Sequence, residues 1–292
     1  MTHAPPDPGM TTPQANYRTA FTLIEVMVVI AMIGVLLGVL IISLSTVQDS
    51  SRIAVDLSNQ SQIIKSNINF ATDNKGRLFH PRTVGDDPSG GSDVNEDAIE
   101  RMWVRDDWET PNTVPTTVTG IEALQAGAAW EYVGNEDSYR SPNDPGIRLR
   151  SYSLNAFVGV NKGADDFDGY AGNPPPNLGV NYIPCPTLAR ISLPSRTLGC
   201  IIEDDPEYPN NWNGFLVHPG WPTTTISQWI DIPAWDWTPG RVTIAYMDGS
   251  TENYRLSDHQ ELTEMVQDHD VIHDSVDYDF FKDLMLPGRV QN

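Results

Sequence analysis

One apolar segment near the N-terminus constrains this chain more than any other feature. Almost every residue from 21 to 44 is apolar, and residues 26–42 contain no polar side chain. At about 1.5 Å per residue, a helix over this segment is about 35 Å long, which is enough to cross a bilayer. Residues 1–20 are polar, rich in Pro and Thr, and without apolar periodicity. We expect these first residues to form an unstructured leader.

The apolar segment carries one charge, on Glu25. An ionised carboxylate in a transmembrane helix costs about 2.5–3.5 kcal/mol or more, so it needs a partner. If the chain were cut between Ala20 and Phe21, the new α-amino group of Phe21 would lie about one helical turn from Glu25. The same amine on a neighbouring subunit could pair with Glu25 during assembly.

The order of residues around the segment differs from that of an ordinary secretory signal. The small residue, Ala20, precedes the apolar run, whereas a secretory signal has its small-residue cleavage site after the run. Arg18 on the leader side and a strongly acidic chain after the helix favour a cytoplasmic N-terminus and an external C-terminal domain. The alternative interpretation is a plain single-pass anchor, with Glu25 reaching the membrane edge.

These residues resemble the prepilin-type cleavage and methylation motif. The sequence Arg18-Thr-Ala20 is followed by Phe21-Thr-Leu-Ile-Glu25-Val and a long apolar run. The resemblance implies that prepilin peptidase cuts between Ala20 and Phe21 and methylates the new amine of Phe21. It further implies that Glu25 guides entry into a helical filament of pilin or pseudopilin subunits, with the inner-membrane assembly machinery as a partner. Ala20 stands where the family usually has Gly.

The pattern after residue 45 predicts that the helix continues. Apolar residues recur at spacings of three, four or seven on one helical face, and Asn74-Lys75-Gly76 supplies a C-terminal stop. We expect four parts: a cytoplasmic leader (1–20), the transmembrane half of a long helix (21–45), its amphipathic half (46–76), and an external globular domain with an acidic C-terminal tail (77–292). The apolar positions of the amphipathic half are Ile53, Leu57, Ile64, Ile68 and Ala71.

Strand signals recur among long Pro- and Gly-rich loops, at residues 151–160, 197–202, 242–247 and 251–256. The last two flank Asp248-Gly249, which predicts a hairpin with a two-residue turn and positive φ at both central positions. We therefore predict an α+β, pilin-like fold, with a long N-terminal helix packed on an antiparallel sheet with large loops.

Composition limits the partners of the domain. The formal net charge of −21 disfavours nucleic acid and anionic lipid headgroups, because both would add repulsion. The two cysteines, Cys185 and Cys200, could form one disulfide in an oxidising compartment.

Two clusters suggest metals. The acidic loop with Asp165, Asp166 and Asp168 could hold calcium, although it lacks EF-hand spacing and a solvated turn is the alternative. The segment Glu203-Asp204-Asp205 is a weaker candidate. His269 and His273, four residues apart, would share one face of a helix and could bind zinc, but surface histidines explain them as well.

The sequence favours a structural filament subunit over an enzyme, of the type IV pilus or type II secretion kind. Two other classes stay open: a membrane-tethered metal-dependent enzyme using His269 and His273, and a surface carbohydrate-binding module. The binding module would use Trp229, Trp235 and Trp237, which could instead fill the core. The methylation state of Phe21 would distinguish the filament subunit from both.

Overall fold

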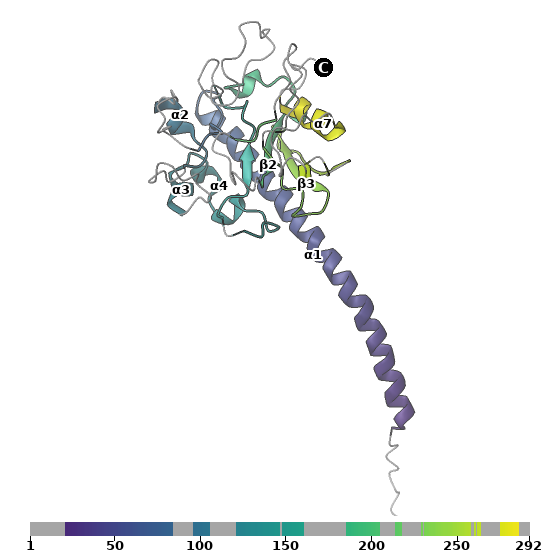
Figure 1. Cartoon of the computed structure of the whole chain (residues 1–292). Coiled ribbons are helices and arrows are strands. Elements are labelled where there is room, and N and C mark those ends of the chain that lie inside the picture. Colours follow the sequence, from purple (N-terminus) through teal and green to yellow (C-terminus); the bar gives the residue numbers. More distant parts are fainter. Residues whose placement is uncertain are drawn as a thin grey trace, which may run out of the picture. The chain divides into compact units, whose positions relative to one another are not determined.

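The computed structural model describes residues 21–83, 96–105, 121–146, 148–160, 185–204, 214–217, 229, 231–257, 260, 262–263 and 275–285, without the side chains of residues 42, 43, 45, 46 and 96. It divides into two compact units, Met1–Asp49 and Ser50–Asn292. The fold is α+β, as predicted, with an N-terminal apolar helix and a four-stranded antiparallel sheet (Figure 1).

The long helix α1 spans Leu23–Asp73 and contributes to both units. It ends where the sequence predicted, because Lys75 and Gly76 have φ angles of 57° and 83°. The Gly76 N–H donates to the Ala71 carbonyl at 2.7 Å and so caps the last turn.

The sheet consists of β1 (Tyr152–Leu154), β2 (Leu198–Ile202), β3 (Arg241–Tyr246) and β4 (Thr251–Arg255), in that spatial order. All neighbouring strands are antiparallel, and each strand lies within or beside a segment predicted from the sequence. Both faces are covered in the second unit, which explains why β2 and nearly all of β3 are buried.

Helix α1 covers one face of the sheet. The Gln60 side-chain amide donates to the carbonyl and hydroxyl oxygens of Thr243 on β3, at 3.0 and 2.8 Å. A Cβ added at Gly199 would lie 2.5 Å from Ile64 Cδ1, so this glycine permits the close approach of β2 and α1.

The opposite face is covered by helix α7 (Val276–Met285). Phe280 stacks on Tyr254 of β4 at 4.0 Å between ring centroids, and Tyr254 and Val242 are paired on the same face. Tyr278 and Phe281 are buried in the core. The prediction of an acidic tail is therefore incomplete, because this part of the tail is an amphipathic helix packed inside the domain.

Among the described residues, short elements separate the longer ones along the chain, four before β1 and two between β1 and β2. They are α2 (Glu96–Arg101), α3 (Ile121–Ala126), α4 (Trp130–Val133), and the 3₁₀ turns η1 (Glu136–Tyr139), η3 (Leu188–Arg190) and η4 (Pro194–Arg196).

The β3–β4 hairpin differs from the predicted two-residue turn. The Gly249 N–H donates to the Tyr246 carbonyl and the Tyr246 N–H to the Ser250 carbonyl, which encloses three residues. Of Asp248 and Gly249, only Gly249 has a positive φ, at 85°. This geometry is a turn followed by a bulged glycine, a common three-residue hairpin loop. The Asp248 carboxylate stabilises it by accepting from the Ser250 N–H at 2.9 Å.

Candidate processing and assembly site

The first turn of α1 is closed by Thr22 and Glu25. The Thr22 N–H and hydroxyl donate to Glu25 Oε2 at 2.7 and 2.8 Å, and the Glu25 N–H lies 3.3 Å from the Thr22 hydroxyl oxygen that accepts from it. This reciprocal arrangement is a capping box, in which two backbone donors of the first turn are satisfied by side chains. The negative carboxylate also lies at the positive end of the helix dipole.

The capping box gives Glu25 a local role that the sequence interpretation missed. The spacing Thr-x-x-Glu before an apolar run is its signal, and it is present at residues 22–25. Because a single oxygen of Glu25 accepts both bonds from Thr22, the other oxygen, Oε1, is left for a further donor.

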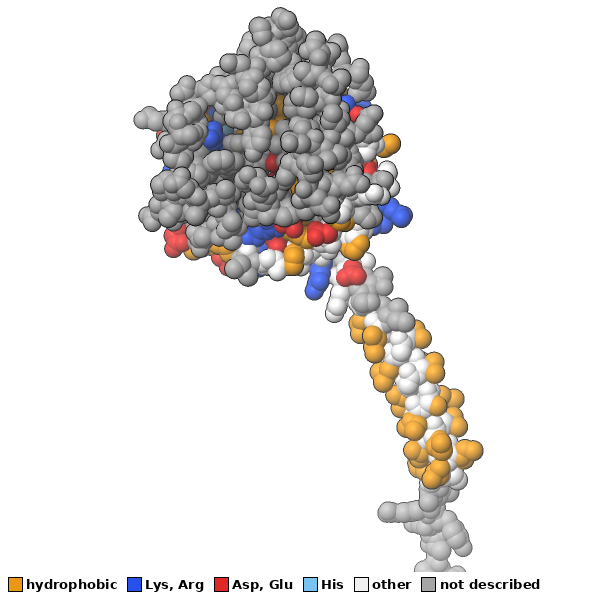
Figure 2. All heavy atoms as spheres, viewed as in Figure 1, with side chains coloured by type: hydrophobic (Ala, Val, Ile, Leu, Met, Phe, Trp, Pro, Cys, Tyr) orange, Lys and Arg blue, Asp and Glu red, His pale blue; other side chains and the backbone are white. Residues whose placement is uncertain are grey.

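The helix that follows is apolar on all sides. Leu23–Ile41 is the one candidate membrane span among the described residues, with a mean hydropathy of 2.9 over 19 residues, judged by length and composition. Every residue from 21 to 41 is exposed, and Figure 2 shows hydrophobic side chains along the visible face of this part of α1. A helix that exposes such side chains all round must be covered by lipid or by other helices.

Gly34 and Gly38 leave open space on this helix, since a Cβ added at either would meet nothing within 4 Å. Two small residues four positions apart permit close approach of another helix.

Beyond residue 50, α1 is held in its unit by polar side chains. Asp56 is fully buried, and its two carboxylate oxygens accept from the Tyr152 hydroxyl at 2.7 Å and the Asn143 amide at 2.9 Å. Asn59 donates to the Arg140 carbonyl at 3.2 Å, and Gln62 donates to the Val133 carbonyl at 3.0 Å.

This polar contact was not predicted, because the sequence pattern placed apolar residues alone on the buried face. Ile64 and Ala71 are indeed fully buried, whereas Ile53 and Leu57 are only partly buried. Burial raises the pKa of the Asp56 carboxyl, and the hydrogen bonds from Tyr152, Ser141 and Asn143 act in the opposite direction.

The three tryptophans, which the sequence assigned either to the core or to a binding surface, lie largely in the packing of the domain. Trp229 is buried and its ring lies 5.4 Å from that of Phe281. Trp235 and Trp237 are partly buried and pack against the core. The Trp237 indole N–H donates to Asp204 at 2.8 Å, and the Arg148 guanidinium lies 4.7 Å from the Trp237 ring. These contacts favour the core-filling interpretation.

The aspartates and histidines of the two main metal predictions lie outside the described residues, and among the described residues no group of three potential metal-binding side chains occurs. Calcium at Asp165, Asp166 and Asp168 and zinc at His269 and His273 therefore stay predictions. The Asp204 carboxylate forms an ion pair with the Arg148 guanidinium at 2.8 Å and accepts a hydrogen bond from the Trp237 indole N–H. Both carboxylate oxygens therefore take part in structural contacts.

The structure contains no disulfide between Cys185 and Cys200, although the sequence permits one. Both cysteines are buried. Cys200 lies within β2, opposite Leu154 and Ala245. The backbone of Cys185 pairs with that of Val158 in an isolated β-bridge, and the Cys185 thiol donates to the Arg190 carbonyl. Separate backbone pairings therefore fix each cysteine, and burial raises the pKa of the Cys200 thiol.

Comparison with known proteins bears on the N-terminal site. Residues 15–41 match the model of the prokaryotic N-terminal methylation motif, so the chain carries the prepilin-type cleavage and methylation signal. This motif and the apolar N-terminal helix support a type IV pilin- or pseudopilin-like precursor with a single-pass membrane anchor. No curated protein and no solved structure matches the chain.

Proposed function

We propose that this protein is a structural subunit of a type IV pilus-like or type II secretion filament. Prepilin peptidase removes residues 1–20 and methylates the amine of Phe21, with the leader in the cytoplasm and the globular domain outside. The observation that carries the proposal is the methylation motif joined to a capped, fully exposed apolar helix.

In the proposed mechanism, α1 resides in the inner membrane until it moves into the filament. Its apolar surface exchanges lipid for neighbouring helices, so no apolar side chain is transferred to water. Gly34 and Gly38 permit close helix contact during this exchange.

Glu25 fixes the axial position of the entering subunit. Glu25 Oε2 is occupied by Thr22 of its own chain, and Glu25 Oε1 accepts from the methylated amine of Phe21 on a neighbour. Pairing of opposite charges in a low-dielectric surrounding disfavours other registers, because they would leave both charges unpaired.

The decisive experiment is N-terminal mass spectrometry of the mature protein from its native host. We expect a chain that begins at N-methylated Phe21. Ala20→Gly should be processed at least as well as the wild type, and a large residue in Ala20→Leu should leave the precursor uncut. A mature chain that retains its first twenty residues would refute the proposal.

A second test separates processing from assembly. Glu25→Ala should still be cut and methylated but should form few filaments, measured as sheared polymer per cell. Leu23→Ala is the matched control on the same turn, because it leaves the capping box and the charge intact. Normal polymer from Glu25→Ala would contradict the role given to this carboxylate.

A further inference from the structure

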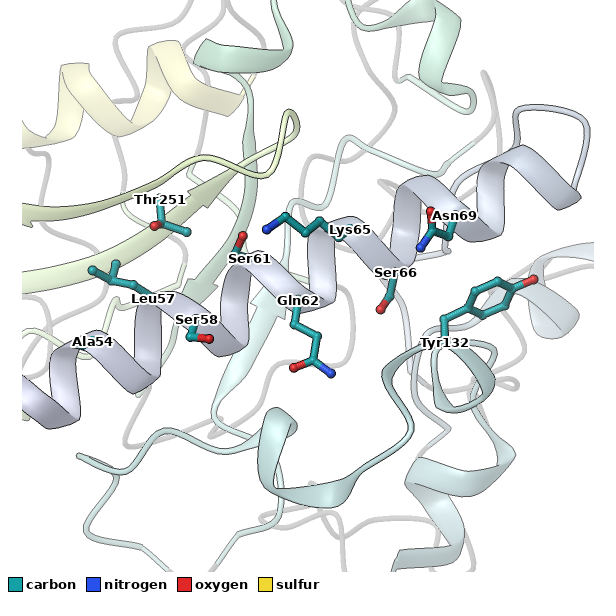
Figure 3. Close-up of a pocket in the computed structure, with 10 residues that line it drawn as sticks. All are labelled: Ala54, Leu57, Ser58, Ser61, Gln62, Lys65, Ser66, Asn69, Tyr132 and Thr251. Atoms are coloured by element: carbon teal, nitrogen blue, oxygen red, sulfur yellow. The ribbon is translucent and has the colours of Figure 1, made fainter.

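A groove runs along the exposed face of α1 within the second unit, between the β3–β4 hairpin and α4. It has a volume of about 580 Å³. Figure 3 shows α1 as its floor, with Thr251 of β4 on one side and Tyr132 of α4 on the other. The residues of the floor are Ala54, Leu57, Ser58, Ser61, Gln62, Lys65, Ser66 and Asn69.

The charge of this groove differs from that of the chain as a whole. The protein has 39 acidic and 18 basic residues. Among the described residues that line the groove there is no Asp or Glu, and Lys65 is the one charged side chain. Hydroxyl and amide groups make up most of the remaining lining. Ser61, Gln62 and Tyr132 donate within the chain, whereas Ser58 and Asn69 are exposed in the groove beside the cation.

The position of Lys65 is set by the hairpin turn. A Cβ added at Gly249 would lie 3.5 and 3.6 Å from Lys65 Cγ and Cε, so the aliphatic stem packs beneath the turn. Ser61 donates to the Gly249 carbonyl at 2.8 Å and fastens the same turn to α1. Lys65 is exposed and forms no ion pair with any residue that the structure describes.

We infer that this groove binds an acidic segment of a second copy of this chain in the filament. Charge complementarity selects the occupant, because two copies with a formal charge of −21 repel unless their contact pairs a cation with acidic groups. A helical filament is built from heterologous contacts, in which a groove on one subunit meets a different surface on the next. The inference rests on the proposed function.

The contact can be captured in the full-length protein in its native host. A photoreactive amino acid replaces Ser58, which is exposed in the groove, and Ser195, exposed on η4 outside it, is the matched control site. Irradiation of assembled filaments should give a dimer of this chain from position 58 but not from position 195. Mass spectrometry of the dimer should place the crosslink in a segment that contains Asp or Glu.

Charge variants of Lys65 then test the ion pair. Lys65→Gln should lower the yield of the position-58 dimer about fivefold, which is the largest effect expected from the loss of one exposed ion pair. Lys65→Glu should lower it further, and Lys65→Arg should preserve it. Raising the salt concentration should reduce the wild-type yield, because exposed charges are screened.

The outcomes separate the two proposals. Filaments that form with methylated Phe21 but give no position-58 dimer, or an undiminished dimer in Lys65→Glu, would overturn the groove inference alone. A crosslink to a different polypeptide would also overturn it. An uncut chain without filaments would overturn the proposed function, and the groove inference with it.

Discussion

The carboxylate of Asp56 on α1 accepts a 2.7 Å hydrogen bond from the hydroxyl of Tyr152 on β1, across 96 positions of sequence. Asn143 donates to the other carboxylate oxygen, so the buried acid joins the helix, the first strand and the chain between α4 and β1. Such a buried group is stabilising only while its hydrogen bonds are complete.

Replacing Asp56 with Asn should destabilise the second unit by about 1–3 kcal/mol at pH 7, because an amide donor would face groups that themselves donate. Thermal or denaturant unfolding of the full chain in detergent measures the change. Asp49→Asn, at an exposed position of the same helix, is the control and should have little effect.

The loss of stability caused by Asp56→Asn should depend on pH. Burial raises the pKa of Asp56 in the folded state, so its contribution to stability is full below the unfolded pKa of about 3.9 and declines as pH rises through the folded pKa. The destabilisation by Asp56→Asn should therefore be larger at pH 4 than at pH 7. A difference that grows with rising pH would contradict this assignment.

Substitution of Thr22 by Ala should loosen the start of α1, because the Glu25 N–H and carboxylate both lose the Thr22 hydroxyl. Loss of such a cap costs about 0.5–2 kcal/mol, which corresponds to a roughly two- to thirtyfold drop in amide-exchange protection. Hydrogen exchange at Leu23–Val26 in detergent measures it. Thr22→Ser retains the hydroxyl and should retain protection; equal exchange in the Ala and Ser variants would exclude the cap.

Gly159→Ala should unfold the domain more readily than an ordinary surface change. Gly159 has a φ of 87°, and an added Cβ would lie 1.7 Å from the Phe79 carbonyl oxygen. The left-handed conformation alone costs a residue with a Cβ about 1–2 kcal/mol, and the backbone clash adds to it. Gly134→Ala, with a φ of 75° and no atom within 4 Å of its Cβ, isolates the conformational part. Equal shifts in the unfolding midpoint for the two variants would show that the clash is relieved.

The two cysteines should behave as protected, reduced thiols. A maleimide should leave Cys185 and Cys200 unmodified in the folded chain, because both are buried and burial raises the pKa of Cys200. After denaturation without reductant, intact-mass measurement should show two added labels. A denatured chain that takes up no label would reveal a bridge instead.

The long helix and the four strands could be predicted because their signals are local. Apolar length, the Asn74-Lys75-Gly76 stop and the alternation around Asp248-Gly249 all lie within a few residues of the elements they define. The exact loop of the hairpin was missed, since both a two-residue and a three-residue turn suit Asp-Gly, and packing of Ser61 and Lys65 against Gly249 accompanies the longer one.

Helix α7 could have been found from its own pattern. Tyr278, Phe281 and Leu284 recur every three residues and are buried, while Asp279 and Lys282 form an ion pair at 2.8 Å. The sequence prediction missed this helical period because it considered only the high acidic content of the tail.

The polar contacts that α1 makes with the domain could not be predicted from one sequence. Asp56, Asn59 and Gln62 have the composition of an exposed helix surface, and their partners lie 71 to 96 residues away in the chain. Only the three-dimensional pairing shows that these side chains are satisfied inside the unit.

The helix cap has a consequence for maturation. Thr22 and Glu25, which close the first turn of α1, both belong to the part of the chain that remains when the leader is removed. The helix begins at Leu23, two residues beyond the proposed cut. The peptidase would thus meet a bond ahead of the helical segment, and no turn would have to unwind for it to act. Precursor and mature subunit would share one membrane helix, so the gain from proteolysis is a liberated, positively charged chain end rather than a refolded anchor.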